Sequence, residues 1–431
     1  MSNEPLSVVL LWHMHQPEYR NPRTGVFQLP WTYLHGIKDY VDMAAHLEHH
    51  PEARVVVNFA PVLLEQLDEY VRQVRAYLAD GSPIHDPLLS LLADPVLPVD
   101  EEGRHWLIRA CMRINRPRML DRFPAYHRLV RIAEWFEQHE EALAYLDQQF
   151  LVDLLVWYHL AWMGETVRRS DRRIRELMDK GRMFTLSERR RLLGIIADLL
   201  DSIIPRYRQL WDRGQIEVSL TPYAHPISPL LLDLGVAEEA LPDIKLPLVP
   251  HYPGGEPRSH WHLHHALEVF QGHFGRRPRG CWPAEGGLSR QTLELLAEHG
   301  FQWTASGEAV LRNSLKASGD PLKAGDCIHR AYRVKDAATR VFFRDDGLSD
   351  LIGFQYADWH AEDAVDNLVG HLENIEKACE GAPNRVASII LDGENAWEHY
   401  PENGYHFLDT LYDRLASHPR LRMSTYAEVI D

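Results

Sequence analysis

Seven short apolar runs, most of them followed by a stretch with helical spacing, constrain the fold of this 431-residue chain more than any other feature. Short, nearly continuous apolar runs are typical of strands buried on both faces, and alternation of strands with helices is typical of a parallel sheet. We place the strands at Ser7–Trp12, Arg54–Phe59, Gln215–Leu220, Arg279–Trp282, Phe301–Thr304, Thr339–Phe343 and Val386–Leu391. The fold class predicted is α/β: a distorted, TIM-like (β/α)7 barrel, one strand short of the eight-stranded form.

The spacing of apolar residues changes between the second and third strands. No strand is predicted over residues 61–213, where apolar side chains recur at helical spacing and the run Leu151–Trp162 is apolar nearly all round. Thr185 and Glu188 have the spacing of a capping box that begins a further helix. A large helical insertion is therefore expected between strands two and three, where it either forms a wall of a cleft or only supports the barrel.

These patterns divide the chain into three parts. We expect a catalytic barrel over residues 1–60 and 214–400, the helical insertion over 61–213, and a short C-terminal helical extension over 401–431.

Bulk composition excludes several classes of partner. The formal net charge of −16 argues against nucleic acid, because phosphate binding requires a basic surface. The first apolar run, Val8–Leu11, is too short for a signal peptide or a membrane span, so no membrane partner and a cytoplasmic location are expected. The four cysteines form no CxxC pair, so reduced thiols are expected and no cofactor or zinc knuckle is indicated.

Two of the predicted strands end in a carboxylate followed by glycine. Glu285-Gly286 follows the fourth strand, and Asp392-Gly393 follows the seventh. Parallel barrels carry their chemistry at the carboxyl ends of strands, and a pair of carboxylates delivered there suits acid/base or covalent sugar chemistry. Either acid alone would be interpreted as a helix cap. Together, beside aromatic and histidine neighbours, they indicate a catalytic pair.

Two histidines follow the first strand. His13 and His15 are two residues apart, so in an extended chain they point to the same side. They indicate a polar pocket, a metal site, or a pair of hydrogen-bonded structural histidines. We favour the pocket over the metal because no third ligand is apparent near them in the sequence.

Other polar and aromatic residues remain open between binding and structural roles. Alternation in the third strand sends Glu217 into the barrel, where it either lines the cleft or has a structural role. The tryptophans near proposed site residues (Trp12, Trp282 and Trp397) suit the apolar faces of sugar rings, and core packing is the alternative for each. Past the sixth strand, Arg344 with Asp345, Asp346 and Asp350 forms either a substrate-binding group or a charge-satisfied loop.

Four stretches together carry a family resemblance, in the order that the family has them. They are His13-Met14-His15-Gln16-Pro17, Gly214–Val218, Gly280–Glu285 and Leu391–Tyr400. The chain resembles glycoside hydrolase family 57, whose members act on α-glucans and have a (β/α)7 barrel. It departs from longer members in its C-terminal region, which looks reduced to residues 402–431, so substrate preference is not carried over with the resemblance.

The resemblance implies roles for individual residues. Glu285 matches the nucleophile and Asp392 the general acid/base, while His13, His15 and Glu217 match residues that line the sugar subsite. The full set of substrate-binding candidates is Trp12, His13, His15, Gln16, Glu217, His225, Trp282, Asp345, Asp350, Glu394, Trp397 and His399, with no metal ligand.

The implied function is retaining hydrolysis of α-1,4-glucans, of amylase or amylopullulanase type, with an oligo- or polysaccharide substrate. The alternative on the same site is a 4-α-glucanotransferase or branching-type transglycosylase. Other classes left open are a metal-dependent carbohydrate hydrolase or deacetylase and a non-catalytic glucan-binding protein.

Overall fold

The computed structural model describes residues 4–249, 251–319, 328–335 and 337–431. Seven parallel strands close into a barrel in the order β1-β2-β3-β4-β5-β7-β8, with β8 pairing back onto β1. They are β1 (Leu6–Met14), β2 (Val55–Phe59), β3 (Ile216–Leu220), β4 (Gly280–Cys281), β5 (Trp303–Gly307), β7 (Arg340–Arg344) and β8 (Val386–Asp392). The predicted α/β barrel of seven strands is confirmed, and each predicted strand overlaps an observed one. A further short strand, β6 (Tyr332–Arg333), pairs antiparallel with β7.

Alternation along the strands separates two apolar layers. In β1, Val9 and Leu11 belong to the cluster inside the barrel, whereas Leu10 and Trp12 belong to the larger cluster beneath the surrounding helices. The interior is narrow enough that one strand must lack a side chain. A Cβ on Gly280 would lie 1.8 Å from the indole of Trp303, so glycine is required there.

The last residues of the chain close one end of the barrel. Strand β9 (Leu421–Met423) pairs in parallel with the first residues of β1, and helix α19 (Tyr426–Ile430) follows it. The ring of Tyr426 is fully buried and stacks on Phe342 inside the barrel. The part expected as a short helical extension, residues 401–431, holds helices and also strand β9, whose three residues are too few to give a sequence pattern.

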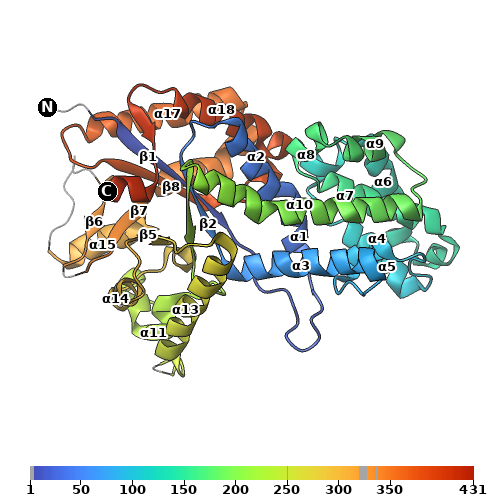
Figure 1. Ribbon diagram of the computed structural model, residues 1–431, viewed down its shortest axis with the longest axis horizontal. Helices are drawn as coiled ribbons and strands as arrows, with labels where there is room; N and C mark the ends of the chain where they lie inside the picture. Colours follow the sequence, from blue (N-terminus) through green and yellow to red (C-terminus); the bar gives the residue numbers. More distant parts are fainter. Residues whose placement is uncertain (1–3, 250, 320–327, 336) are drawn as a thin grey trace.

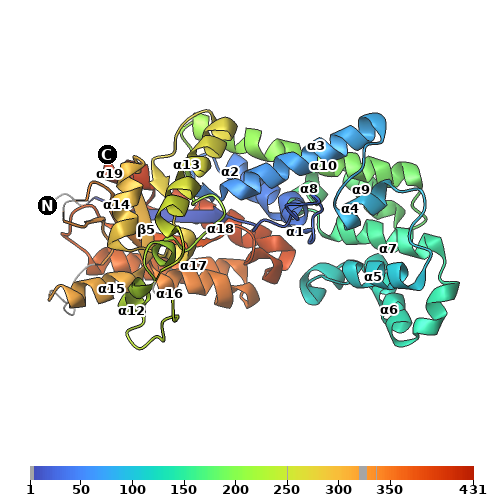
Figure 2. The same cartoon turned by 90° about the horizontal axis from the view of Figure 1, so that it is seen from below.

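The segment between β2 and β3 consists of helices and the loops that connect them. Every residue of 61–213 is described and none is in a strand, and the predicted capping box of Thr185 and Glu188 begins the longest of these helices. The elements are α3 (Pro61–Asp80), α4 (Pro87–Ala93), α5 (Glu101–Cys111), η2 (Arg116–Leu120), α6 (Pro124–Gln138), η3 (Glu140–Tyr145), α7 (Gln148–Ala161), α8 (Glu165–Ser170), α9 (Arg172–Lys180) and α10 (Leu186–Asp212). Helices α3 and α10 run side by side from the barrel into this helical body (Figures 1 and 2).

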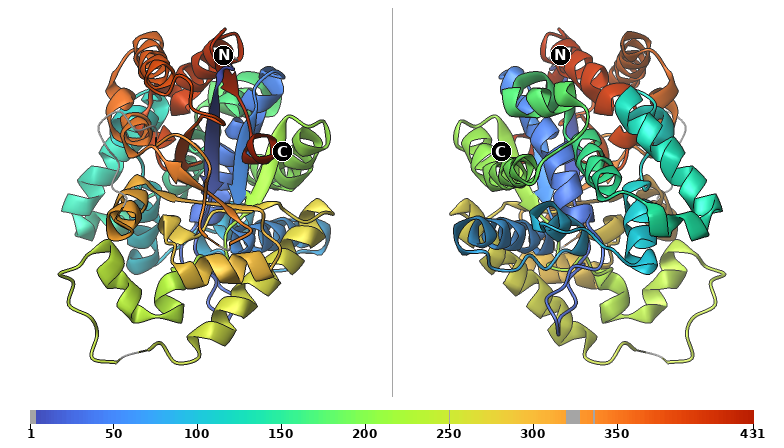
Figure 3. Two further views of the ribbon diagram at one scale, coloured as in Figure 1. Left: turned by 90° about the vertical axis from the view of Figure 1, so that its left-hand side faces the viewer. Right: turned by 90° about the vertical axis from the view of Figure 1, so that its right-hand side faces the viewer.

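The remaining helices surround the barrel. Before β2 come α1 (Trp31–His35), η1 (Gly36–Tyr40) and α2 (Val41–His49). Between β3 and β7 lie α11 (Ser228–Leu232), η4 (Leu234–Val236), α12 (Ala237–Ala240), α13 (Gly255–Phe274), η5 (Ala284–Gly286), α14 (Arg290–Glu298) and α15 (Glu308–Ala317). After β7 come α16 (Asp346–Asp350), η6 (Leu351–Gln355), η7 (Tyr356–Asp358), α17 (Ala361–Ala378), η8 (Trp397–His399), η9 (Pro401–Gly404) and α18 (Tyr405–Ala416). Seen from the insertion side, the green and teal helices of the insertion lie in front of the barrel (Figure 3, right).

Two general expectations can be compared with the structure. Among the residues described, no helix combines the length and the apolar character that a membrane span requires. Cys111 and Cys281 are buried free thiols, but Cys379 is disulfide-bonded, so the expectation of reduced thiols is wrong at that position.

Candidate active site

A layer of polar side chains crosses the carboxyl ends of four neighbouring strands. Strand register places His13 of β1 beside Asn58 of β2 and Asp392 of β8, and Asn58 beside Ser219 of β3. His13 Nδ1 donates to Asn58 Oδ1 at 2.7 Å, and Asn58 Nδ2 donates to Ser219 Oγ at 2.9 Å. This chain fixes the tautomer of His13, leaving Nε2 as an acceptor toward the barrel mouth. Sequence reasoning missed Asn58, although a lone polar residue near the end of an apolar strand is a usable signal.

Three histidines form a stacked group above this layer. His225 lies after β3, and its ring stacks on His15 with centroids 3.9 Å apart, while its Nε2 is 3.1 Å from His13 Nε2. Burial, then repulsion from His225, lowers the pKa of His13 to about 3, and burial is also the main cause that lowers the pKa of His15 and of His225. The group is therefore neutral near pH 7 and suited to uncharged hydroxyl groups rather than to anions.

His225 corrects the expectation that no third ligand lies near His13 and His15. Ring nitrogens of the three histidines all lie within 4.8 Å of one another, a spacing that could hold a metal ion. Their planes, however, are inclined to one another by only 9–24°. An imidazole binds a metal in its own ring plane at about 2.0–2.1 Å, and stacked rings occupy different planes. The rings would have to turn before one ion could reach all three.

Glu285 lies immediately beyond β4, on the far side of the barrel from β8. Its backbone is in the left-handed region at φ 55°, and its side chain is exposed. A non-glycine residue held there is strained by about 1–3 kcal/mol, and such strain is common at functional positions. His225 also has a left-handed backbone, at φ 56°. Among the described residues, none forms a hydrogen bond with the Glu285 carboxylate, which is therefore free to meet a ligand.

Asp392 ends β8 and is only partly accessible to solvent. Burial raises the pKa of its carboxyl group, and the smaller opposing effects come from a hydrogen bond with Asn395 and from the charges of His225 and Arg344. The loop turns directly after it at Gly393, whose N–H donates to His13 O at 2.7 Å. A Cβ at Gly393 would lie 2.2 Å from Met14 Sδ, so only glycine lets the loop approach β1 this closely.

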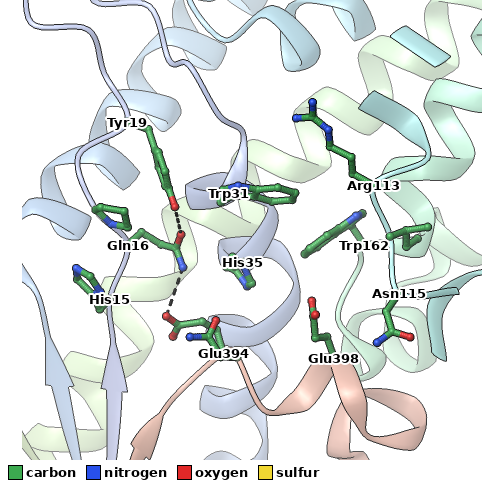
Figure 4. Close-up of a pocket in the computed structure, with 13 residues that line it drawn as sticks. His15, Gln16, Tyr19, Trp31, His35, Arg113, Asn115, Trp162, Glu394 and Glu398 are labelled. Carbon is green, nitrogen blue, oxygen red and sulfur yellow. Dashed lines mark hydrogen bonds between the residues drawn. The ribbon is translucent and has the colours of Figure 1, made fainter. Parts of the chain in front are cut away.

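A pocket with a volume of about 520 Å³ adjoins this group, between the barrel and the helical insertion (Figure 4). On the barrel side, Tyr19 donates to Gln16 Oε1 at 3.1 Å, and Gln16 Nε2 donates to Glu394 Oε1 at 3.3 Å. Glu394 Oε2 and His15 Nε2 are buried, and neither has a hydrogen-bond partner among the described residues. Buried polar atoms are normally paired, so these two atoms mark a place for a ligand or water. Burial also raises the pKa of Glu394 well above its ordinary value.

The three predicted tryptophans lie outside this pocket. Trp12 is fully buried on the helix-facing side of β1, where its Nε1 donates to Tyr412 OH at 2.9 Å. Trp397 packs against it and donates to Gly393 O at 3.0 Å. Both are packing residues in this structure. Trp282 lies inside the barrel, next to the turn at Gly286.

The predicted acidic residues also separate by location. Glu217 points into the barrel as predicted, but two positions below Ser219, where it accepts from Trp303 Nε1 at 2.7 Å and from Ala427 N at 2.9 Å. It therefore joins β3 to the C-terminal helix rather than to the histidines. Asp345 caps helix α16. Asp346 and Asp350 both form ion pairs with Arg344. His399 is exposed and lies beside Glu398.

The other side of the pocket comes from residues that sequence reasoning missed. Trp31 and His35 lie on α1, and Arg113, Asn115 and Trp162 lie on the insertion. The rings of Trp31 and Trp162 have centroids 5.8 Å apart. Trp31 and His35 have helical spacing on one face, which is a weak signal. The insertion residues give none, because packing alone brings them to the barrel.

Comparison with solved structures supports the fold. A GH57-type branching enzyme from Pyrococcus horikoshii has a TM-score of 0.55 at 15% identity, over 99% of this chain and 70% of that chain. The α-amylase AmyC from Thermotoga maritima has a TM-score of 0.55 at 13% identity, over 99% and 74%. A GH57 branching enzyme from Thermococcus kodakaraensis has a TM-score of 0.51 at 16% identity, over 99% and 70%. At such identities the likeness shows the fold alone.

Sequence comparison identifies the family. The sequence has no significant match among curated proteins. The model of glycosyl hydrolase family 57 matches residues 9–431, which includes the polar strand ends, Glu285 and Asp392. Because that match covers nearly the whole sequence, the chain belongs to glycosyl hydrolase family 57.

Proposed function

We propose that this protein is a retaining glycosidase that acts on α-1,4-glucans, with Glu285 as nucleophile and Asp392 as general acid/base. Membership of the family implies a glycosidase or transglycosylase. The observation that carries the finer proposal is the placement of Asp392: it ends β8 in register with His13 and borders the neutral imidazole group. The similar solved structures are described as an amylase and as branching enzymes, which supports an α-glucan substrate.

In the proposed mechanism, Glu285 attacks the anomeric carbon while Asp392 protonates the leaving glycosidic oxygen. The glycosyl-enzyme then breaks down when Asp392, now ionised, removes a proton from the incoming water or sugar hydroxyl. Burial favours the protonated form of Asp392 that the first step needs. The neutral imidazoles of His13, His15 and His225 offer hydrogen bonds to the hydroxyls of the sugar being transferred.

Transfer to a second glucan is the alternative reaction at the same site. The similarity to branching enzymes is the reason to keep this alternative open. The test is chromatography of products after incubation with maltoheptaose, amylose or pullulan. Hydrolysis releases one new reducing end for each bond cleaved, whereas transfer gives longer or branched chains without a net gain of reducing ends. Absence of any new product from all three substrates would contradict the proposal.

A further inference from the structure

The pocket between the barrel and the helical insertion continues directly from the catalytic residues. His15 belongs both to the imidazole group beside Asp392 and to the lining of the pocket. Glu394, two residues after Asp392 on the same loop, lies on the pocket floor and is only 2% exposed. A ligand anchored at the strand ends can therefore extend into the pocket without leaving the protein surface.

The lining of the pocket suits a neutral polyhydroxyl ligand. The lining includes Arg113 as well as Glu394 and Glu398, so it carries charges of both signs. An anion would meet the two carboxyl groups, and a cation would meet the guanidinium. Trp31 is half-buried and presents an aromatic surface of the kind that packs on the apolar face of a sugar ring.

The pocket also has unused hydrogen-bonding capacity on both sides. Glu394 Oε2 is buried without a partner among the described residues, and so is His15 Nε2. Across the pocket, no carboxylate in the described part of the chain pairs with Arg113, and Asn115 uses only its Oδ1, which accepts from Arg118 N at 3.2 Å. Glu394 Oε2 and His15 Nε2 are buried and so require a ligand or water, whereas Arg113 is exposed and is open to water or to a ligand.

We propose that this pocket is a subsite for a further glucosyl unit of the substrate, and that the helical insertion forms one wall of it through Arg113, Asn115 and Trp162. The proposal rests on the proposed function, because it takes the α-glucan as the ligand. It assigns the insertion a direct role in binding, and it makes affinity depend on chain length: a short substrate occupies only the catalytic centre, whereas a longer one also reaches the insertion.

The test compares the wild-type protein with Arg113→Ala and with a matched control, Arg116→Ala. Arg116 is exposed on the same segment, pairs with Glu134 and does not line the pocket. We expect Arg113→Ala to lower kcat/KM for maltoheptaose about tenfold, as loss of one charged hydrogen bond would. Its kcat/KM for a short aryl α-glucoside should stay within about twofold of wild type, and Arg116→Ala should match wild type on both substrates.

Trp31→Ala provides a second probe, on helix α1, with its fold checked by circular dichroism. It should show the same selective loss on maltoheptaose. Equal turnover of maltoheptaose by wild type, Arg113→Ala and Trp31→Ala would overturn the subsite and leave the proposed function standing.

Calorimetric titration with maltoheptaose separates the two proposals further. Binding that Arg113→Ala weakens, without turnover by any variant, would overturn the proposed function but support the subsite. Neither binding nor turnover by the wild-type protein would overturn both.

Discussion

Asn395 Nδ2 donates a hydrogen bond of 2.7 Å to Asp392 Oδ2, three residues earlier on the loop that follows β8. This bond stabilises the ionised carboxylate, whereas burial stabilises the neutral acid. Burial is the larger effect, so the pKa of Asp392 is raised. The two opposing effects set the pH above which a general acid at this position loses its proton.

Asn395→Ala should therefore move the alkaline limb of the pH profile upward. Without the amide donor, the ionised form of Asp392 loses stabilisation, its pKa rises further, and the acid stays protonated to higher pH. We expect the limb of kcat/KM to shift by about one pH unit, the size of one hydrogen bond to a charged group. Arg116→Ala, an exposed change away from the pocket, is the control and should leave the profile unchanged. A shift to lower pH would contradict the role assigned to Asp392.

The catalytic pair can be tested by removing each carboxylate separately. Glu285→Gln should nearly abolish turnover while the fold is kept, because the exposed side chain contributes little to packing. Asp392→Ala should be slow on substrates whose leaving group needs protonation and less impaired on an activated α-glucoside. In a ligand-bound crystal structure, we expect the two carboxyl groups about 5–5.5 Å apart. A separation above roughly 10 Å would lie outside the ranges of both retaining and inverting enzymes.

Azide distinguishes the two roles by stereochemistry. In Asp392→Ala, azide should attack the β-linked glycosyl-enzyme and give the α-glycosyl azide. In Glu285→Ala, azide should replace the nucleophile directly and give the β-glycosyl azide by a single inversion. Analysis of the products by NMR measures this, and the opposite assignment would exchange the roles of Glu285 and Asp392.

Exhaustive treatment with EDTA should leave activity intact. His13, His15 and His225 bring their ring nitrogens together, but the stacked planes of the rings cannot all contain one ion. Metal analysis of the purified protein should accordingly show no stoichiometric zinc. Loss of activity with the chelator, restored by zinc, would show that the rings turn to bind a metal ion. That result would favour the metal-dependent class of carbohydrate enzyme.

Glu217 should make stability fall as pH rises. Burial raises its pKa from 4.5 to about 7, so between these values the folded protein holds a proton that the unfolded chain has lost. The stabilisation from this proton is complete below about pH 4.5 and disappears as pH rises through about 7. We expect the unfolding free energy of the wild type, relative to that of Glu217→Gln, to fall by up to about 3 kcal/mol from pH 4.5 to pH 8. Chemical denaturation at both pH values measures it, and a difference independent of pH would refute the assignment.

The strands were predictable because each is a short apolar run, and the two carboxylates were predictable because each ends such a run. The same alternation that directs His13 inward also directs Trp12 outward, so its packing role could have been read from the sequence. The distance of Glu217 from the barrel mouth could not be predicted, because the sequence shows which face of a strand a side chain lies on but not which residues it contacts. The pocket was also hidden, because Arg113 and Trp162 reach it through packing of the insertion rather than through any local pattern.

The pairing of the first strand has a consequence for how the protein folds during synthesis. Leu6–Val8 pair with residues 421–423, and Trp12 donates to a tyrosine 400 positions later. Contacts of such sequence separation form slowly, because a long loop must close before they contribute. The barrel cannot close until β8, which ends at Asp392, has left the ribosome, and its end is not capped until residues near 430 follow. The insertion, whose contacts are more local, can form earlier. Until then the apolar edge of β1 is unpaired, and this is the period in which the nascent chain is most prone to aggregate.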